Sequence, residues 1–221
     1  MSSTNPSPLS ALEDDSRDLA PRVRARLTSF WADPGPHARF LNMLSLLEHI
    51  GSRKIMASQE KAEWDHDILK HLAEETRHAF FFKRAAERMA RRALDYSAAN
   101  TMAGASARAY MGRLDAEIAR HLGPSAAALP YLYMSLIVEL RAVWTYRIYQ
   151  KVLAGQDAGL SLKSVLAEEE LHLAAMLARL RTMDRDAGDR VTLFCGFEAV
   201  RFRALWSAIE GECVRAPLAA E

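Results

Sequence analysis

Cysteine, glycine and proline are scarce in this chain. Its 221 residues include two cysteines, ten glycines and eight prolines. Cys195 and Cys213 are eighteen positions apart and no C-x-x-C pair occurs, which excludes a zinc ribbon, a rubredoxin-type iron centre and a dithiol redox motif. A reduced, cytoplasmic setting fits this cysteine usage best.

An excess of charge of either sign is also absent. The chain has 29 basic and 28 acidic residues, a net charge of +1, so we expect neither a nucleic-acid partner nor binding to a membrane surface. Its local arginine clusters are typical of solvated helix faces. These clusters are Arg22, Arg24 and Arg26, and Arg84, Arg88, Arg91 and Arg92.

Long apolar runs are missing as well. The most apolar stretch, residues 130–144, is interrupted by Glu139 and Arg141, and a membrane span needs roughly 20 apolar residues. Residues 1–20 have neither a basic start nor an apolar core, so they predict a flexible arm and no signal peptide.

Glycine and proline gather at a few breaks, and every segment between the breaks has helical spacing. The sequence therefore predicts an all-α protein. Ser161 is the expected N-cap of the fourth long helix. The helices are expected over residues 21–31, 37–58, 61–96, 104–122, 130–154 and 161–183, with a last one from about residue 190.

The four long segments form two hairpins joined by a long crossover. The crossover covers 64 residues from Glu75 to Glu139, which is typical of a ferritin-like four-helix bundle. Additional helices precede the bundle, lie in the crossover and follow the bundle. We expect a single domain over residues 21–221, with the bundle at about residues 37–183.

The same short pattern, Glu-x-x-His, occurs in the second and in the fourth long segment. Each copy follows a lone glutamate in an apolar run, at separations of 27 and 30 residues. Glu and His three apart share one helix face, so four helices can direct all six groups inward to hold two metal ions. The predicted ligands are Glu48, Glu75, His78, Glu139, Glu169 and His172.

The same six residues could also occur in a protein that binds no metal. Glu-x-x-His arises freely in glutamate-rich helices, and a third copy, Glu63 with His66, lies too far along its segment to join the others. A buried glutamate such as Glu139 can also pair with an arginine of a neighbouring helix. In that case the six groups would form a purely structural polar network.

Carboxylate and imidazole donors without thiolates favour two iron ions, and manganese or a mixed iron and manganese pair fits the same donors. Glu75 and Glu169 are the expected bridges between the two ions. Imidazole ligands need a partner on the second ring nitrogen. An acidic residue, Glu74 or Glu168, precedes each pair, although acidic side chains also commonly face solvent.

Over residues 37–183 the chain resembles the ferritin-like di-iron carboxylate superfamily, whose pattern the six residues match. The resemblance implies that Glu74 and Glu168 each hold the histidine of the opposite pair. The superfamily includes ferroxidases, rubrerythrin-type peroxidases, reductase subunits, desaturases and hydroxylases. Phe82 stands where a reductase subunit has its radical tyrosine, and two cysteines cannot build the four-cysteine centre of rubrerythrins.

The expected function is therefore that of a di-iron oxidase or oxygenase. It would use O₂ and a separate electron donor to hydroxylate or desaturate a small organic substrate. The alternative is an iron-handling protein that oxidises iron or consumes peroxide without an organic substrate. The sequence is also compatible with assembly into a homodimer.

Overall fold

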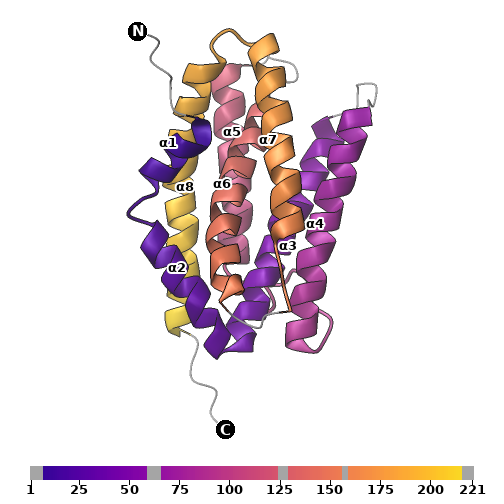
Figure 1. The fold of residues 1–221 in the computed structure, drawn as a ribbon, viewed down its shortest axis with the longest axis vertical. Coiled ribbons are helices and arrows are strands. Elements are labelled where there is room, and N and C mark those ends of the chain that lie inside the picture. The colour runs from indigo at the N-terminus through magenta and orange to yellow at the C-terminus, as the bar shows by residue number, and fades with distance from the viewer. Residues whose placement is uncertain (1–6, 59–65, 124–128, 156–158, 216–221) are drawn as a thin grey trace. The chain divides into compact units, whose positions relative to one another are not determined.

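The computed structural model describes residues 7–58, 66–123, 129–155 and 159–215 (Figure 1). All regular elements within these ranges are helices, and the ranges contain no strand, which confirms the all-α prediction. Within them, no helix has both the length and the apolar character needed to cross a bilayer. The helices are α1 (Pro8–Asp15), α2 (Ala20–Ser29), η1 (Phe30–Ala32), α3 (Pro34–Ser58), α4 (His66–Ala90), α5 (Gly104–Leu122), α6 (Leu129–Ala154), α7 (Lys163–Met183) and α8 (Ala187–Arg215).

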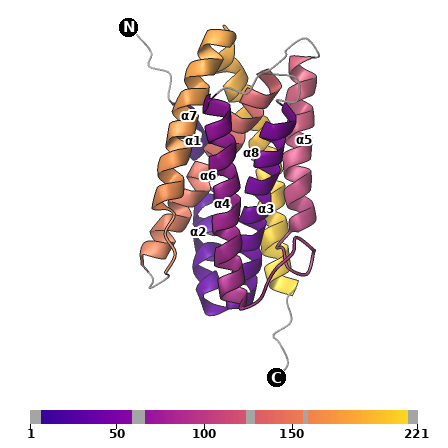
Figure 2. The same ribbon diagram turned by 90° about the vertical axis from the view of Figure 1, so that its right-hand side faces the viewer.

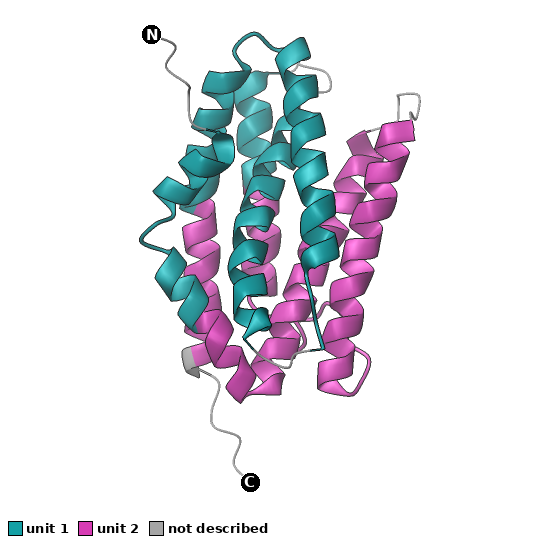
Figure 3. Cartoon of the chain, viewed as in Figure 1, with its two compact units in different colours: residues 1–25, 114–200 teal, residues 26–113, 201–221 magenta. Residues whose placement is uncertain are grey.

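The chain divides into two compact units (Figure 3). Unit 1 comprises residues 1–25 and 114–200, and unit 2 comprises residues 26–113 and 201–221. The boundary falls inside helices α2, α5 and α8 and not in a linker. The single domain expected over residues 21–221 stays a prediction.

Unit 2 is built on α3 and α4, which pack side by side (Figures 1 and 2). Apolar and small residues line the buried face of α4, among them Ile68, Phe82 and Ala86. On α3, Phe40 is fully buried and meets the ring of Trp206 edge to face, with ring centroids 6.5 Å apart. These contacts join the last part of α8 to the α3–α4 pair.

The segment after α4 is held by a buried amide. The Asn42 amide nitrogen donates to the carbonyl oxygens of Asp95 and Asn100, at 2.8 and 2.9 Å. Arg91 has a φ of 53°, a left-handed conformation that a helix interior does not accept. Helix α4 therefore ends at Ala90, and the predicted helix over residues 61–96 was too long at its C-terminal end.

Unit 1 is centred on α6, which contacts both α7 and α1. Of its 26 residues, 17 are buried, as expected for a helix that is apolar on all sides. Tyr133 meets the ring of Phe194 on α8 at 5.0 Å between centroids. Helix α6 thus forms the core of this unit.

Other parts of the helical structure also differ from the sequence predictions. Residues 8–15, expected in a flexible arm, form α1, because the Ser7 hydroxyl caps it and Leu12 is buried. Helix α3 begins three residues early at Pro34, where the Asp33 carboxylate accepts from the Gly35 amide at 2.9 Å.

A further difference concerns the cap of α7. Leu162 and not Ser161 is the N-cap, and no side chain of the cap residue closes the helix. Instead, the Leu162 amide donates to Oε1 of Gln150 on α6 at 2.6 Å. Gln150 of the preceding helix therefore holds the N-cap residue, while the Ser161 hydroxyl accepts from the Lys163 amide at 3.4 Å.

Candidate metal centre

Unit 2 brings three predicted ligands together in its core. Glu48 comes from α3, and Glu75 and His78 lie one turn apart on one face of α4. Each of the three offers an atom within 4.8 Å of the others. Two ligands of one ion are at most about 4.4 Å apart, twice a metal–ligand distance of about 2.2 Å. Small side-chain adjustments therefore suffice to bring all three onto a cation.

The three side chains of this cluster are almost completely buried, although all three are polar or charged. Glu48, Glu75 and His78 expose only 7%, 6% and 1% of their surfaces. Placing two carboxylates in one apolar interior is costly unless positive charge or hydrogen bonds compensate. A divalent cation supplies that compensation, so this buried Glu/His cluster could hold a metal ion.

Unit 1 carries a second cluster of the same composition. Glu139 lies on α6, and Glu169 and His172 lie one turn apart on α7. The Nδ1 atom of His172 is 3.2 Å from Oε2 of Glu169 and 3.9 Å from Oε2 of Glu139. All three residues are buried. Because Nδ1 faces both carboxylates, it is the ring nitrogen that could bind a cation with them.

The six predicted ligands therefore form two buried triplets, each from one lone glutamate and one Glu-x-x-His pair. Each triplet comes from two packed helices, α3 and α4 in unit 2 and α6 and α7 in unit 1. The sharing of ions between the triplets, and the bridging roles of Glu75 and Glu169, stay predictions.

The acidic residues that precede the pairs differ in burial. Glu74 exposes 9% of its surface, and its Oε1 lies 3.7 Å from the Lys70 ammonium and 4.0 Å from the Arg77 guanidinium. Glu168 is half-buried. Their expected role, which is to hold the histidine of the opposite pair, also stays a prediction.

His71 is a group that the sequence analysis missed. It lies one turn before Glu75 on α4, exposes 12% of its side chain, and places Nε2 3.4 Å from Oε1 of Glu75. The signal was present in the sequence, because residues four apart share a helix face. His71, Glu75 and His78 form the pattern His-x-x-x-Glu-x-x-His. Of the third Glu-x-x-His copy, His66 is exposed, and Glu63 lies outside the described residues.

Gly51 leaves space beside Glu75. A Cβ atom added to this glycine on α3 would lie 3.3 Å from Oε2 of Glu75. That distance is tighter than ordinary van der Waals contact, so any larger residue would press on the carboxylate. The two oxygens of Glu75 thus face different neighbours, Gly51 on one side and His71 on the other.

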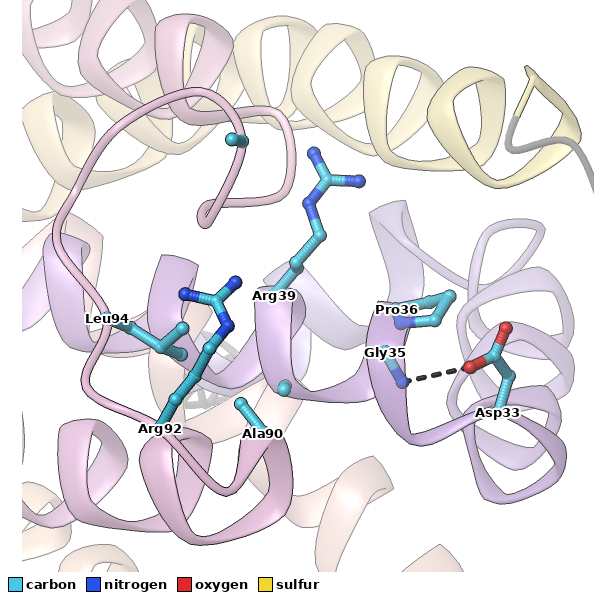
Figure 4. Close-up of a pocket in the computed structure, with 9 residues that line it drawn as sticks. Asp33, Gly35, Pro36, Arg39, Ala90, Arg92 and Leu94 are labelled. Atoms are coloured by element: carbon cyan, nitrogen blue, oxygen red, sulfur yellow. Dashed lines mark hydrogen bonds between the residues drawn. The ribbon is translucent and has the colours of Figure 1, made fainter. Parts of the chain in front are cut away.

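A pocket of about 360 Å³ lies elsewhere in unit 2, between the start of α3 and the segment after α4 (Figure 4). Arg39 and Arg92 line it, and both guanidinium groups are engaged, Arg39 with Glu212 and Arg92 with Asn100, each at 2.6 Å. No predicted ligand is among the described residues that line the pocket. It is therefore separate from the Glu48, Glu75 and His78 cluster.

The donor atoms of both triplets are oxygen and nitrogen only. Cys195 and Cys213 are free, and neither belongs to a cluster of candidate ligands among the described residues. This agrees with the donor set expected for iron or manganese and not with a thiolate zinc or copper site.

Comparison with known proteins adds no identification. No family model matches the chain, and neither a curated protein nor a solved structure is significantly similar to it.

Proposed function

We propose that the two triplets share a pair of iron ions, as the dinuclear centre of a ferritin-like bundle. The observation that carries the proposal is that each unit buries two glutamates and one histidine close together, Glu48, Glu75 and His78 in unit 2 and Glu139, Glu169 and His172 in unit 1. Two divalent ions would neutralise the four carboxylates together. This charge balance explains why the protein interior tolerates so many buried acids.

The protein's own residues would prepare the site for redox chemistry. The helices α3, α4, α6 and α7 hold the ligands, since each donor is on a regular helix and not on a loop. Burial of the ligands excludes bulk water. An iron pair supplies, when bound, two electrons to O₂.

We propose that the reaction is the O₂-dependent oxidation of a small organic substrate. In a hydroxylation, one oxygen atom enters a C–H bond and the other leaves as water, with two electrons and two protons from a separate donor. The substrate must reach the ligands, so it is expected to be small and largely apolar, in keeping with the apolar residues of α6.

A second candidate function is the oxidation of iron or removal of peroxide without an organic substrate. One observation favours it: all six candidate ligands are buried, which suits small reactants such as Fe²⁺, O₂ and peroxide. Rapid consumption of Fe²⁺ and O₂ with no carbon-containing product would support this candidate. A hydroxylated product that contains ¹⁸O from ¹⁸O₂ would support the first candidate. A desaturated product whose formation consumes electrons from the donor would support it as well.

The deciding experiment is the metal content of protein purified from iron-supplemented cells. We expect about two iron ions per chain, and loss of most iron in both Glu48→Ala and Glu139→Ala. The matched control is Glu170→Ala, because this exposed neighbour of Glu169 pairs with Arg147 on the surface. Absence of metal from the unaltered chain, with the fold intact, would leave a structural polar network instead.

A separate measurement tests whether the ions form a pair. Protein loaded with Mn²⁺ should give an electron paramagnetic resonance signal of exchange-coupled ions. Signals of isolated Mn²⁺ only, with the unaltered chain fully loaded, would contradict a shared centre while leaving each triplet as a metal site.

A further inference from the structure

His71 lies close to the proposed centre without belonging to either Glu-x-x-His pair. Its Nε2 atom faces Oε1 of Glu75 at 3.4 Å, and its side chain is only 12% exposed. It lies one turn before Glu75 and two turns before His78 on the same face of α4. Three potential ligands, His71, Glu75 and His78, therefore follow one another along one face of α4.

The distance from His71 to Glu75 is longer than a good hydrogen bond between a ring nitrogen and a carboxylate, which is about 2.7–3.2 Å. A separation of 3.4 Å is instead ordinary for two ligands of one cation, which lie up to about 4.4 Å apart. His71 also belongs, with Glu75, to a group of side chains whose ligand atoms lie within 4.8 Å of one another. The position therefore suits a donor atom on a cation.

Glu75 belongs to two such groups. It shares one with Glu48 and His78 and the other with His71. Its Oε1 faces His71, while its Oε2 faces Gly51. A carboxylate whose two oxygens face different sides can bridge two ions, one on each side. If Glu75 bridged two ions in this way, His71 would lie beside the ion on the Oε1 side.

We propose that His71 is a seventh ligand of the metal pair, bound through Nε2 to the ion on the Oε1 side of Glu75. This inference rests on the proposed dinuclear function. With His71 bound, one of the two ions would have an imidazole ligand in addition to the six predicted ligands. The two metal positions would therefore differ in their ligands. Imidazole donors raise affinity for the later divalent metals, so Co²⁺ should fill the position next to His71 first.

The test is an anaerobic Co²⁺ titration followed by the visible absorption of the bound ion and by the metal content per chain. The variants are His71→Ala and His71→Gln, and the control is His66→Ala, an exposed histidine at the start of the same helix. We expect the unaltered chain and the control to bind about two ions. In both His71 variants one ion should bind at least about tenfold more weakly, with a changed absorption spectrum.

Restoration of the spectrum by added imidazole in His71→Ala would identify the lost donor as a nitrogen ligand. Circular dichroism separates loss of a ligand from loss of the fold, and the glutamine variant keeps the size and polarity of the site. If both His71 variants are folded and bind both ions with unaltered affinity and spectrum, His71 is not a ligand. If the unaltered chain binds no Co²⁺, the proposed centre fails, and the seventh ligand fails with it.

Discussion

Arg141 on α6 and Glu198 on α8 form a two-point ion pair in the interior of unit 1. The guanidinium Nε and Nη2 atoms lie 2.9 and 2.7 Å from the two carboxylate oxygens, and the side chains are 4% and 0% exposed. Nη1 of Arg141 also donates to the Ser16 hydroxyl at 2.9 Å. One buried side chain thus joins α6, α8 and the residue that follows α1.

Removal of Arg141 should therefore destabilise unit 1 strongly. Arg141→Leu leaves the Glu198 carboxylate buried without its main counter-charge, which typically costs about 3–5 kcal/mol. The free energy of unfolding, from urea denaturation followed by circular dichroism, measures the effect. The double variant Arg141→Leu with Glu198→Leu should recover most of the loss, because neither charge of this buried pair remains. A single variant as stable as the unaltered chain would contradict the argument.

Gly51→Ala should weaken metal binding without unfolding the protein. The new Cβ would press on Oε2 of Glu75 from 3.3 Å and displace that carboxylate, for an expected loss of about tenfold in metal affinity. The helix itself gains, since alanine is about 1 kcal/mol better than glycine in a helix interior.

The matched control for that substitution is Gly112→Ala on α5. A Cβ at Gly112 meets no atom within 4 Å, so this variant should gain helix stability and keep its metal affinity. Co²⁺ titration measures both variants. Equal affinities in the two would show that Glu75 is not crowded by Gly51 or does not bind metal.

His37 should make stability fall as the solution becomes acidic. Burial lowers the pKa of His37 to about 4 from its usual 6.5, and its ring stacks on Phe30 at 5.7 Å between centroids. Between about pH 6.5 and pH 4, His37 is protonated in the unfolded chain and stays neutral in the folded chain. Stability is therefore complete above pH 6.5 and declines towards pH 4, by up to about 1.4 kcal/mol per pH unit.

His37→Phe should remove this part of the pH dependence. The measurement is the free energy of unfolding of both proteins at several pH values between 4 and 7, and the difference between the two proteins gives the contribution of the histidine. A difference that stays constant over this range would show that His37 titrates normally in the folded chain.

Tyr133→Phe should cost about 1–3 kcal/mol of stability. The Tyr133 hydroxyl donates to Oδ2 of Asp184 at 2.6 Å, and Arg190 donates to the same oxygen at 2.7 Å. Burial and this bond to Asp184 raise the pKa of Tyr133 above its usual value. A double-mutant cycle with Asp184→Ala should give a coupling energy of about 0.5–3 kcal/mol, and purely additive losses would refute the bond.

Several helix ends depended on contacts that no local pattern reveals. Ser161 has the right chemistry for a helix cap, but Gln150 reaches the start of α7 from the preceding helix. The apolar periodicity of α4 continues past Ala90, and the helix ends there with Arg91 in a left-handed conformation. At the start of α7, a contact with another helix overrides the local capping preference. At the end of α4, the left-handed conformation of Arg91 ends the helix despite the apolar periodicity.

The candidate ligands could be predicted in part. Glu75 with His78 and Glu169 with His172 are adjacent on their helices by spacing alone, and the structure brings Glu48 and Glu139 to them from the partner helix of each pair. His71 was missed because it lies outside the two Glu-x-x-His pairs, although its spacing of four residues from Glu75 puts both on one helix face. Its closeness to Glu75 became evident only once the side chains were placed.

The sequence by itself determined the helical class and the two Glu-x-x-His faces, because helix periodicity and the positions of glycine and proline are local properties of the chain. Only the tertiary structure decided that Leu12 of α1 is buried, that Gln150 of α6 contacts the start of α7 and that Arg141 pairs with Glu198. Each of these joins residues whose contact depends on how side chains pack and orient in three dimensions, and spacing along the chain does not encode that.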